Sequence, residues 1–190
     1  MKKIIVFASG NGSNFEALAR YFQDPNRGVA ISLLVCDHSD AYVLQRAAAF
    51  GIPTLTIAYS DYASKADAEK ALLAQLPACD LIVLAGFMRI IGPTLLEAYP
   101  EQIVNLHPAL LPSFPGRTGI EDAYDYGVKV TGVTVHYVDA GIDSGTIIAQ
   151  EPVWIQSQMT LADLETAIHA VEHDLLPQTI VDLLTKERMA

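Results

Sequence analysis

Apolar runs of strand length alternate with helix-spaced apolar residues along the first half of the chain. The run KIIVFAS at 3–9 is almost continuously apolar, and the segment after it places Phe15, Leu18, Ala19 and Phe22 at helical spacing. The same alternation predicts strands at 29–37, 53–59 and 79–87 and helices at 14–22, 41–50 and 64–76. Strands that are apolar on both faces and alternate with helices are typical of a parallel sheet covered on both sides.

The pattern changes in the second half, where a helix is predicted at 93–100, a strand at 102–108 and a helix at 119–127. Alternating apolar positions lead into a Gly/Asp turn and a second apolar run, which predicts an antiparallel hairpin within 129–155. The segment 160–187 has helical spacing and begins at a capping threonine. Its internal proline, Pro177, is expected to break or kink that helix.

These elements predict an α/β fold with a Rossmann-like open sheet that is mostly parallel and twisted. Helices are expected on both faces, and an antiparallel hairpin is expected in the C-terminal half. We expect a single domain over 1–190, with a βαβ half at about 1–100 and a second half at about 101–190 that holds the hairpin and the last helix.

Charge and composition narrow the possible partners. The formal net charge is −10, and an acidic surface repels phosphate backbones, so nucleic acid is not expected as a partner. The apolar stretches fall short of the roughly 20 residues that span a membrane, so no membrane association is expected. Cys36 and Cys79 lie far apart and form no CxxC pair, which favours two reduced thiols and a cytoplasmic location.

The loop SGNGSN at 9–14 joins the first predicted strand to the first predicted helix. Its glycines allow close backbone approach, and Ser13 and Asn14 are expected to cap the helix. A helix N-terminus after a parallel strand suits a phosphate group. The spacing is neither GxGxxG nor a P-loop, so a single phosphate fits better than a dinucleotide or a nucleoside triphosphate. The alternative is an ordinary tight turn.

The stretch NLHPALLPSFPG at 105–116 places Asn105 and His107 on one side of the end of a predicted strand. An open α/β sheet has its ligand crevice at that end. The amide can donate to an oxygen that gains negative charge, and the imidazole can transfer a proton near neutral pH. The prolines that follow restrict the loop. The alternative is a histidine that only satisfies a buried carbonyl.

The turn VDAGIDSG at 138–145 offers Asp139 and Asp143 as carboxylates that could act on the imidazole, or it is simply a surface turn. We find neither Ser nor Cys in a nucleophile motif such as GxSxG. The sequence therefore favours direct attack of one substrate on another over a covalent enzyme intermediate.

Four motifs in order, SGNGSN, LAGFMRI, NLHPALLPSFPG and GVTVHYVDAGIDSGTII, resemble the folate-dependent formyltransferase family over essentially the whole chain. The first two are similar to the branch that acts on glycinamide ribonucleotide in purine synthesis. The resemblance implies that a formyl group passes from the co-substrate 10-formyltetrahydrofolate to the ribonucleotide amine through a tetrahedral intermediate. It implies small-molecule substrates, no metal, and a monomer or homodimer.

The resemblance also assigns roles to residues. Asn105, His107 and Asp143 would be catalytic, Gly12, Ser13 and Asn14 would hold the substrate phosphate, and Glu172 would lie at the glycinamide end. The folate-binding residues it implies are Lys65, Met88, Arg89, Ile90, Ile91, Asn105, Val138 and Asp143. The Leu111–Pro112 peptide would be cis. One departure is His169, which stands where other members carry Gln.

Other functions stay open at this point. HAVEH at 169–173 fits the H-x-x-E-H pattern of zinc hydrolases, although that pattern needs a third protein ligand. Another formyltetrahydrofolate-dependent transferase, such as the methionyl-tRNA branch, would share the Asn, His and Asp chemistry. A phosphate-binding module without catalysis is a further alternative.

Overall fold

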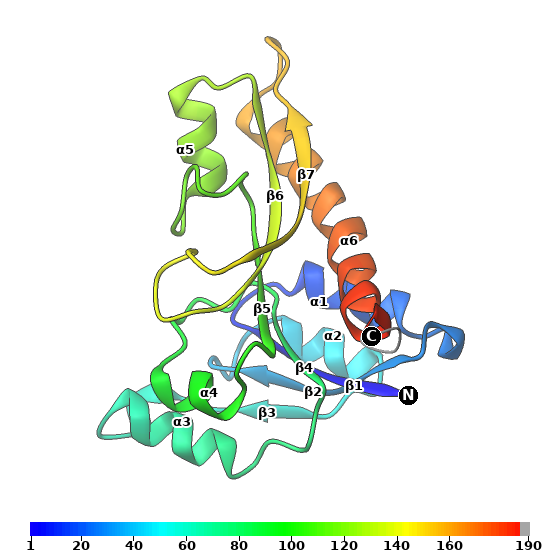
Figure 1. The fold of residues 1–190 in the computed structure, drawn as a ribbon, viewed down its shortest axis with the longest axis vertical. Helices are drawn as coiled ribbons and strands as arrows, with labels where there is room; N and C mark the ends of the chain where they lie inside the picture. The colour runs from blue at the N-terminus through cyan, green and yellow to red at the C-terminus, as the bar shows by residue number, and fades with distance from the viewer. Residues whose placement is uncertain (187–190) are drawn as a thin grey trace.

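A single seven-stranded sheet in the order β3-β2-β1-β4-β5-β6-β7 organises the computed structural model, which describes residues 1–186 (Figure 1). The strands are β1 (Lys2–Ala8), β2 (Val29–Cys36), β3 (Thr54–Thr56), β4 (Leu81–Leu84), β5 (Ile103–His107), β6 (Val130–Tyr137) and β7 (Ile147–Trp154). The first five strands are parallel, whereas β6 is antiparallel to β5 and β7 is antiparallel to β6. The predicted fold class is confirmed, including the hairpin.

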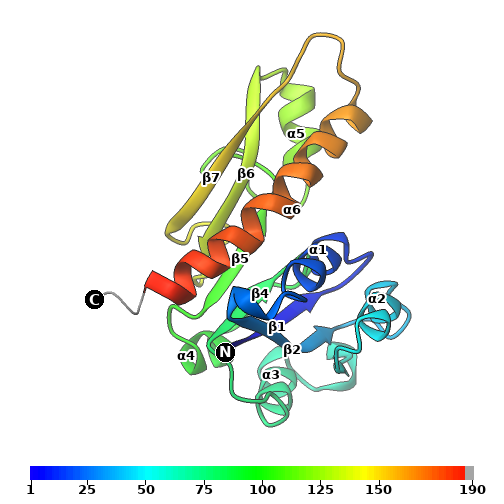
Figure 2. The ribbon, with the colours of Figure 1, turned by 90° about the vertical axis from the view of Figure 1, so that its right-hand side faces the viewer.

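Helices pack on both faces of this sheet (Figure 2). They are α1 (Ser13–Tyr21), α2 (Val43–Ala49), α3 (Lys65–Leu73), α4 (Pro93–Ala98), α5 (Gly119–Tyr126) and α6 (Leu161–Lys186), with short 3-10 turns η1 (Pro25–Arg27) and η2 (Tyr59–Asp61). Alternate residues of β1 separate the two cores. Ile4 and Val6 pack with α1, α2 and α6, while Ile5 and Phe7 pack with α3 and α4.

Some predicted strands are shorter in the structure. The predicted strand 79–87 is reduced to β4, because Gly86 adopts a left-handed conformation (φ 77°) that turns the chain away from the sheet. The predicted strand 53–59 is reduced to the edge strand β3, and the chain enters η2 at Tyr59.

Of the two outcomes predicted at Pro177, a break or a kink, the break is wrong, because α6 continues through this residue as one element (Figure 2). Proline removes one intrahelical hydrogen bond, but Leu176 and Ile180 on either side of it are buried in the core, so packing holds the helix together. At its start, the Thr160 hydroxyl accepts from the backbone N–H of Asp163, which confirms the predicted cap, and the Asp163 carboxylate accepts from the backbone N–H of Thr160. Glu187 of the predicted helix lies outside the described residues.

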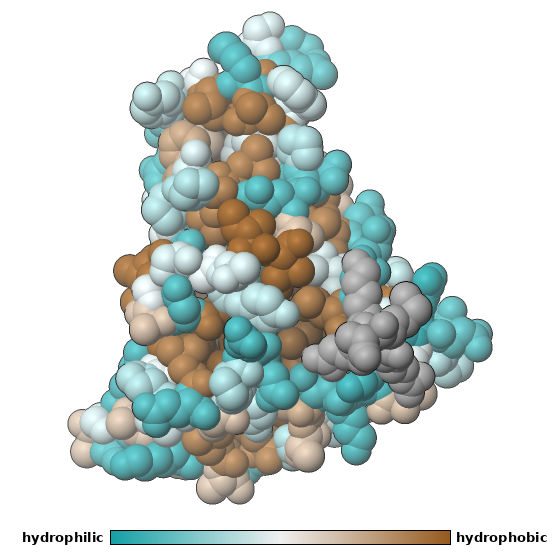
Figure 3. All heavy atoms as spheres, in the orientation of Figure 1, coloured by the Kyte–Doolittle hydropathy of each residue, from teal (hydrophilic) through white to brown (hydrophobic). Residues whose placement is uncertain are grey.

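The outer surface of the sheet edge is partly apolar. Figure 3 shows apolar side chains gathered over β6 and β7, where Ile147 and Trp154 are exposed. Within residues 1–186, no helix is long and apolar enough to cross a membrane. Cys36 and Cys79 are both free thiols.

Candidate active site

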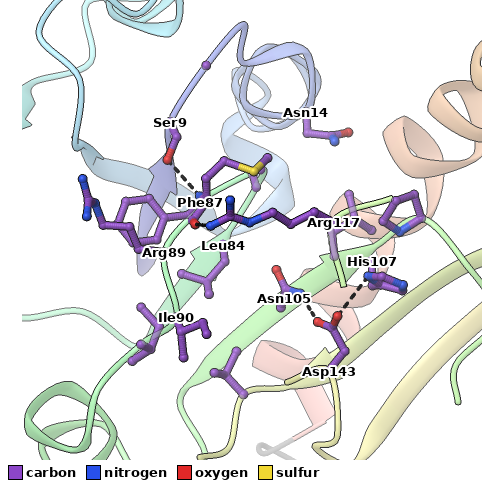
Figure 4. A pocket seen from close by; sticks show the side chains of 18 of the residues that line it. Ser9, Asn14, Leu84, Phe87, Arg89, Ile90, Asn105, His107, Arg117 and Asp143 are labelled. Atoms are coloured by element: carbon purple, nitrogen blue, oxygen red, sulfur yellow. Dashed lines mark hydrogen bonds and ion pairs between the residues drawn. The ribbon is translucent and has the colours of Figure 1, made fainter. Parts of the chain in front are cut away.

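A cavity of about 560 Å³ opens at the carboxyl ends of the central parallel strands (Figure 4). Small-molecule sites typically have volumes of about 300–1,000 Å³. Its lining comes from segments far apart in sequence, namely residues 9–14, 84–91, 105–108, 136–143 and two residues of α6, together with His38, Gly116 and Arg117. An open α/β sheet places ligands at this edge, so the predicted motifs meet at the expected location. Of the predicted site residues, Lys65 does not line the cavity, as described below.

Residues 9–14, the loop predicted to hold a phosphate and called the phosphate loop below, form one end of this cavity. Gly12 occupies the N-cap position of α1 in a left-handed conformation, φ 77°. The predicted capping by Ser13 and Asn14 is wrong, because both residues already lie in the first helical turn and α1 has no side-chain cap. The backbone N–H groups of this turn therefore have no capping oxygen to occupy them, which leaves them available to an anion.

Asn105, His107 and Asp143 meet at the other end, and Figure 4 shows their side chains pointing toward one another. Nδ1 of His107 lies 3.4 Å from one carboxylate oxygen of Asp143, and the amide nitrogen of Asn105 lies 3.4 Å from the other. Asn105 and Asp143 are 38 positions apart in sequence. The fold brings an amide donor, an imidazole and a carboxylate into one cluster, which is suited to stabilising an oxyanion and moving a proton.

The second nitrogen of His107 is also engaged. Nε2 lies 2.8 Å from the backbone carbonyl oxygen of Phe114. A carbonyl can only accept, so Nε2 carries the hydrogen and Nδ1 is the nitrogen that faces Asp143. Both sequence interpretations of His107 therefore hold in part: it satisfies a backbone carbonyl, and it also faces the carboxylate.

Two residues of the cluster have unusual backbones. Phe114 and Asp143 adopt positive φ angles of 53° and 50°, a conformation that costs a non-glycine residue roughly 1–2 kcal/mol. Phe114 supplies the carbonyl to His107, and Asp143 receives a 2.8 Å hydrogen bond from the backbone N–H of Gly116. Local strain is thus concentrated where the loop after β5 and the 138–145 turn hold the imidazole and the carboxylate.

His136 belongs to the cluster, although the sequence analysis did not select it. It pairs with Asn105 across β5 and β6, and its Nε2 lies 3.1 Å from the amide nitrogen of Asn105. Its Nδ1 lies 2.8 Å from the carbonyl oxygen of Tyr137, so Nδ1 donates and Nε2 accepts from Asn105. The sequence signal for His136 was a polar residue inside a strand of alternating apolar positions. Its place beside Asn105 follows only from the register in which β5 pairs with β6.

The pKa of Asp143 lies below its ordinary value. The neighbouring imidazole of His136, whose Nε2 lies 3.6 Å from a carboxylate oxygen, is the largest cause, and burial opposes it. The N–H of Gly116 and the charge of His107 lower this pKa further. The carboxylate therefore stays ionised at neutral pH and can favour a protonated neighbour.

The predicted folate wall lines the cavity over Met88, Arg89, Ile90 and Ile91. Met88 and Ile90 each expose 54% of their surface, so apolar area is available to a ligand. Arg89 is held by Asp37, with 2.6 Å between Nε and a carboxylate oxygen. Arg117 crosses the cavity and donates to the carbonyl of Met88 at 3.1 Å (Figure 4).

The other predicted folate residues differ in placement. Val138 lines the cavity together with Asn105 and Asp143. Lys65 is outside the lining, because α3 directs its side chain toward Gly92 and Glu69. Asp139, the other acidic candidate, accepts hydrogen bonds from the N–H of Gly141 and the hydroxyl of Ser144, and so stabilises the turn itself. The Leu111–Pro112 peptide is cis.

Glu172 lies beside the phosphate loop and is 4% exposed. One of its oxygens accepts from the amide of Asn14 at 3.0 Å and contacts Nδ1 of His169 at 2.8 Å. This bond to Glu172 raises the pKa of His169. The described part of the chain contains no group of three His, Cys, Asp or Glu side chains that could hold a metal ion, so HAVEH gains no third ligand there.

Comparison with known proteins agrees with this geometry. A match to the formyl transferase family covers residues 2–180. Phosphoribosylglycinamide formyltransferase of Bacillus subtilis (strain 168) is 49% identical over 97% of this chain and 95% of its own length. The crystal structure of glycinamide ribonucleotide transformylase 1 from Geobacillus kaustophilus superposes with a TM-score of 0.93 at 48% identity, covering 97% of this chain and 99% of that one. The phosphoribosylglycinamide formyltransferase from Bacillus halodurans gives a TM-score of 0.93 at 46% identity, covering 98% and 97%.

Proposed function

This chain belongs to the formyl transferase family, and on that premise we propose that it transfers a formyl group from 10-formyltetrahydrofolate to the amine of glycinamide ribonucleotide in purine biosynthesis. One observation carries the proposal. A single cavity has a phosphate loop at one end and the Asn105, His107 and Asp143 cluster at the other.

The proposed reaction begins when the ribonucleotide amine attacks the formyl carbon. A carbon–nitrogen bond forms and the formyl oxygen becomes an oxyanion. The tetrahedral intermediate then collapses, the bond to the donor nitrogen breaks, the attacking amine loses a proton, and the donor nitrogen gains one. The covalent chemistry lies between the two substrates, so the protein has to supply position, charge stabilisation and proton transfer.

Asn105 and protonated His107 stabilise the oxyanion in this proposal. The hydrogen bond of Nε2 to Phe114 leaves Nδ1 of His107 as the proton carrier, and its 3.4 Å distance from Asp143 leaves Nδ1 able to contact a substrate atom or a water. Ionised Asp143 stabilises the imidazolium. His136 accepts from the amide nitrogen of Asn105 and so fixes its orientation. The other N–H of that nitrogen, which makes a long 3.4 Å hydrogen bond to Asp143, is the one that we propose donates to the oxyanion.

The substrates occupy the two sides of the cluster. Backbone N–H groups of Gly12, Ser13 and Asn14 hold the ribonucleotide phosphate, and Glu172 contacts the glycinamide end. The folate lies against the wall formed by Met88, Arg89, Ile90 and Ile91 and is closed in by Val138, Asn105 and Asp143, which line the same cavity. Lys65 has no part in this proposal, because its side chain lies outside the lining.

The remaining properties follow from this chemistry. The substrates are small molecules, and the proposal assigns no metal, because Asn105 and His107 provide the charge stabilisation. We place the enzyme in the cytoplasm, which fits its free thiols Cys36 and Cys79. It acts as a monomer or a homodimer.

A formyl-transfer assay tests this function. Purified protein is mixed with 10-formyltetrahydrofolate and glycinamide ribonucleotide, and the deformylated folate is followed optically while mass spectrometry detects the formylated ribonucleotide. We expect both products in equal amounts and none when either substrate is omitted. If folded protein formylates methionyl-tRNA instead, the other branch of the family is correct. If it formylates neither acceptor, the proposal is wrong.

A further inference from the structure

Arg46 of α2 reaches back to the phosphate loop, although it does not line the cavity. Its Nε donates to the backbone carbonyl of Asn11, and its Nη2 donates to the side-chain oxygen of the same residue, both at 2.9 Å. The guanidinium thus grips one loop residue at two points. Its planar fork provides both donors in one fixed orientation, which a lysine ammonium does not reproduce.

The rest of the loop is docked on the start of the same helix. The N–H of Val43 donates to the carbonyl of Gly10 at 3.1 Å. Gly12 packs so tightly on Val43 that an added Cβ would lie 2.3 Å from a methyl carbon of that side chain. Hydrogen bonds and packing from α2 therefore set the path of the loop on both sides of Asn11.

The charge of Arg46 is partly offset within the same cluster. Its guanidinium forms an ion pair with Glu16 of α1 and lies over the ring of Tyr42, 4.9 Å from the centroid. Glu16 also pairs with Arg20, whose side chain is 68% exposed. What distinguishes Arg46 from its neighbour Arg20 is therefore not charge alone but its two hydrogen bonds to Asn11.

We propose that Arg46 is a positioning residue for phosphate recognition, holding residues 11–14 in the anion-binding conformation before the ligand arrives. The N–H groups at the start of α1 have no side-chain cap to order them, so their arrangement depends on how the preceding loop is held. A preformed loop binds more tightly, because less conformational entropy is lost on binding. The identity of the ligand as the ribonucleotide rests on the proposed function, whereas the anion site does not.

Calorimetric binding of ribose 5-phosphate tests this inference without any formyl transfer. Arg46→Met and Arg46→Lys are compared with wild type, and Arg20→Met is the matched control that removes the other partner of Glu16. We expect both Arg46 variants to bind about tenfold more weakly, the effect of losing one or two ordering hydrogen bonds. Arg20→Met should stay within twofold. Asn11→Ala, which removes only the side-chain acceptor, should show a smaller loss.

Steady-state kinetics provide a second readout. The KM for the ribonucleotide should rise by a similar factor in the Arg46 variants, while the KM for the formyl donor and kcat stay within about twofold. Normal binding by Arg46→Met overturns the proposal, and so does normal binding by Arg46→Lys, which would mean that charge alone matters. Absence of binding by wild type also overturns it. If the Arg46 variants bind ribose 5-phosphate more weakly but neither wild type nor any variant catalyses formyl transfer, the proposed function fails and the positioning role stands.

Discussion

The two ends of the cavity are built from different chemical groups. The phosphate loop offers backbone N–H groups of Gly12, Ser13 and Asn14, ordered by a glycine conformation and by contacts with α2. The catalytic end offers the side chains of Asn105, His107 and Asp143, which are ordered by backbone groups of a strained loop. Under the proposed function, substitutions should therefore act differently at each end: backbone geometry should control binding, whereas side-chain identity should control the chemical step.

His107→Asn should have the largest effect. The Asn amide nitrogen takes the place of Nδ1 and can still donate to Asp143, but Asn does not reach the carbonyl of Phe114 and cannot carry the proton. We expect kcat to fall by about 10³-fold, within the range for loss of acid–base catalysis. Steady-state kinetics at saturating substrates measure this, with circular dichroism as the control for folding. An unchanged kcat would remove His107 from the catalytic account.

Asp143→Asn should have the second-largest effect. We expect kcat to fall by about 10²-fold, because the imidazolium of His107 loses its ionised neighbour. Asp139→Asn is the matched control from the same turn. Asn at 139 keeps an oxygen that can accept from Gly141 and Ser144, so kcat should stay within about twofold of wild type. Equal losses in the two variants would mean that the turn, and not the carboxylate at 143, is what matters.

Gly12→Ala tests the binding end. The added Cβ meets Val43, and φ 77° is unfavourable for alanine, so the loop must move. The KM for the ribonucleotide should rise about tenfold or more, with a smaller change in kcat. Gly28→Ala is the control, since Gly28 also has positive φ (71°) but has open space around its Cβ position and lies outside the cavity lining. It should lower stability without raising the KM.

His169→Gln should have the smallest effect. The folded-state pKa of His169 is raised, chiefly by its hydrogen bond to Glu172 and further by the charges of Glu172 and Glu165, while burial opposes this. A raised pKa means that the contribution to stability is complete below the unfolded pKa of about 6.5 and is lost as pH rises through the folded value. His173 of the same helix has a lowered pKa, but it is present in both wild type and His169→Gln and so does not distinguish them.

Thermal unfolding of wild type and His169→Gln at about pH 5.5 and about pH 9 measures this contribution. Wild type should have the higher Tm at the lower pH, and the difference should shrink at the higher pH. Half of the His169 side chain is exposed, so the difference should be small. A Tm difference that is the same at both pH values would show that the hydrogen bond to Glu172 has no ionic component.

Features that depend on local spacing could be predicted from the sequence. The alternation of strands and helices predicted the sheet, and the i, i+2 spacing of Asn105 and His107 placed both at one strand end. The approach of Asp143 to His107 needed the family resemblance, since a separation of tens of residues has no local pattern.

Features that depend on register and on distances between distant segments could not be predicted. His136 faces Asn105 because of the pairing of β5 with β6, and Arg46 reaches Asn11 because α2 packs beside the loop. The capping role expected of Ser13 failed because Gly12 already occupies the cap. The position of Lys65 outside the cavity lining could not be foreseen, because the direction of a side chain on α3 follows from packing.

The most direct test of the division between a binding end and a chemical end of the cavity is the affinity of the ribonucleotide for two variants, His107→Asn and Gly12→Ala, both measured by calorimetry. We predict that His107→Asn binds within about threefold of wild type although its kcat is about 10³-fold lower, whereas Gly12→Ala binds about tenfold or more weakly. The opposite pattern, with affinity lost in His107→Asn and kept in Gly12→Ala, would contradict the assignment of binding to the phosphate loop and chemistry to the side-chain cluster.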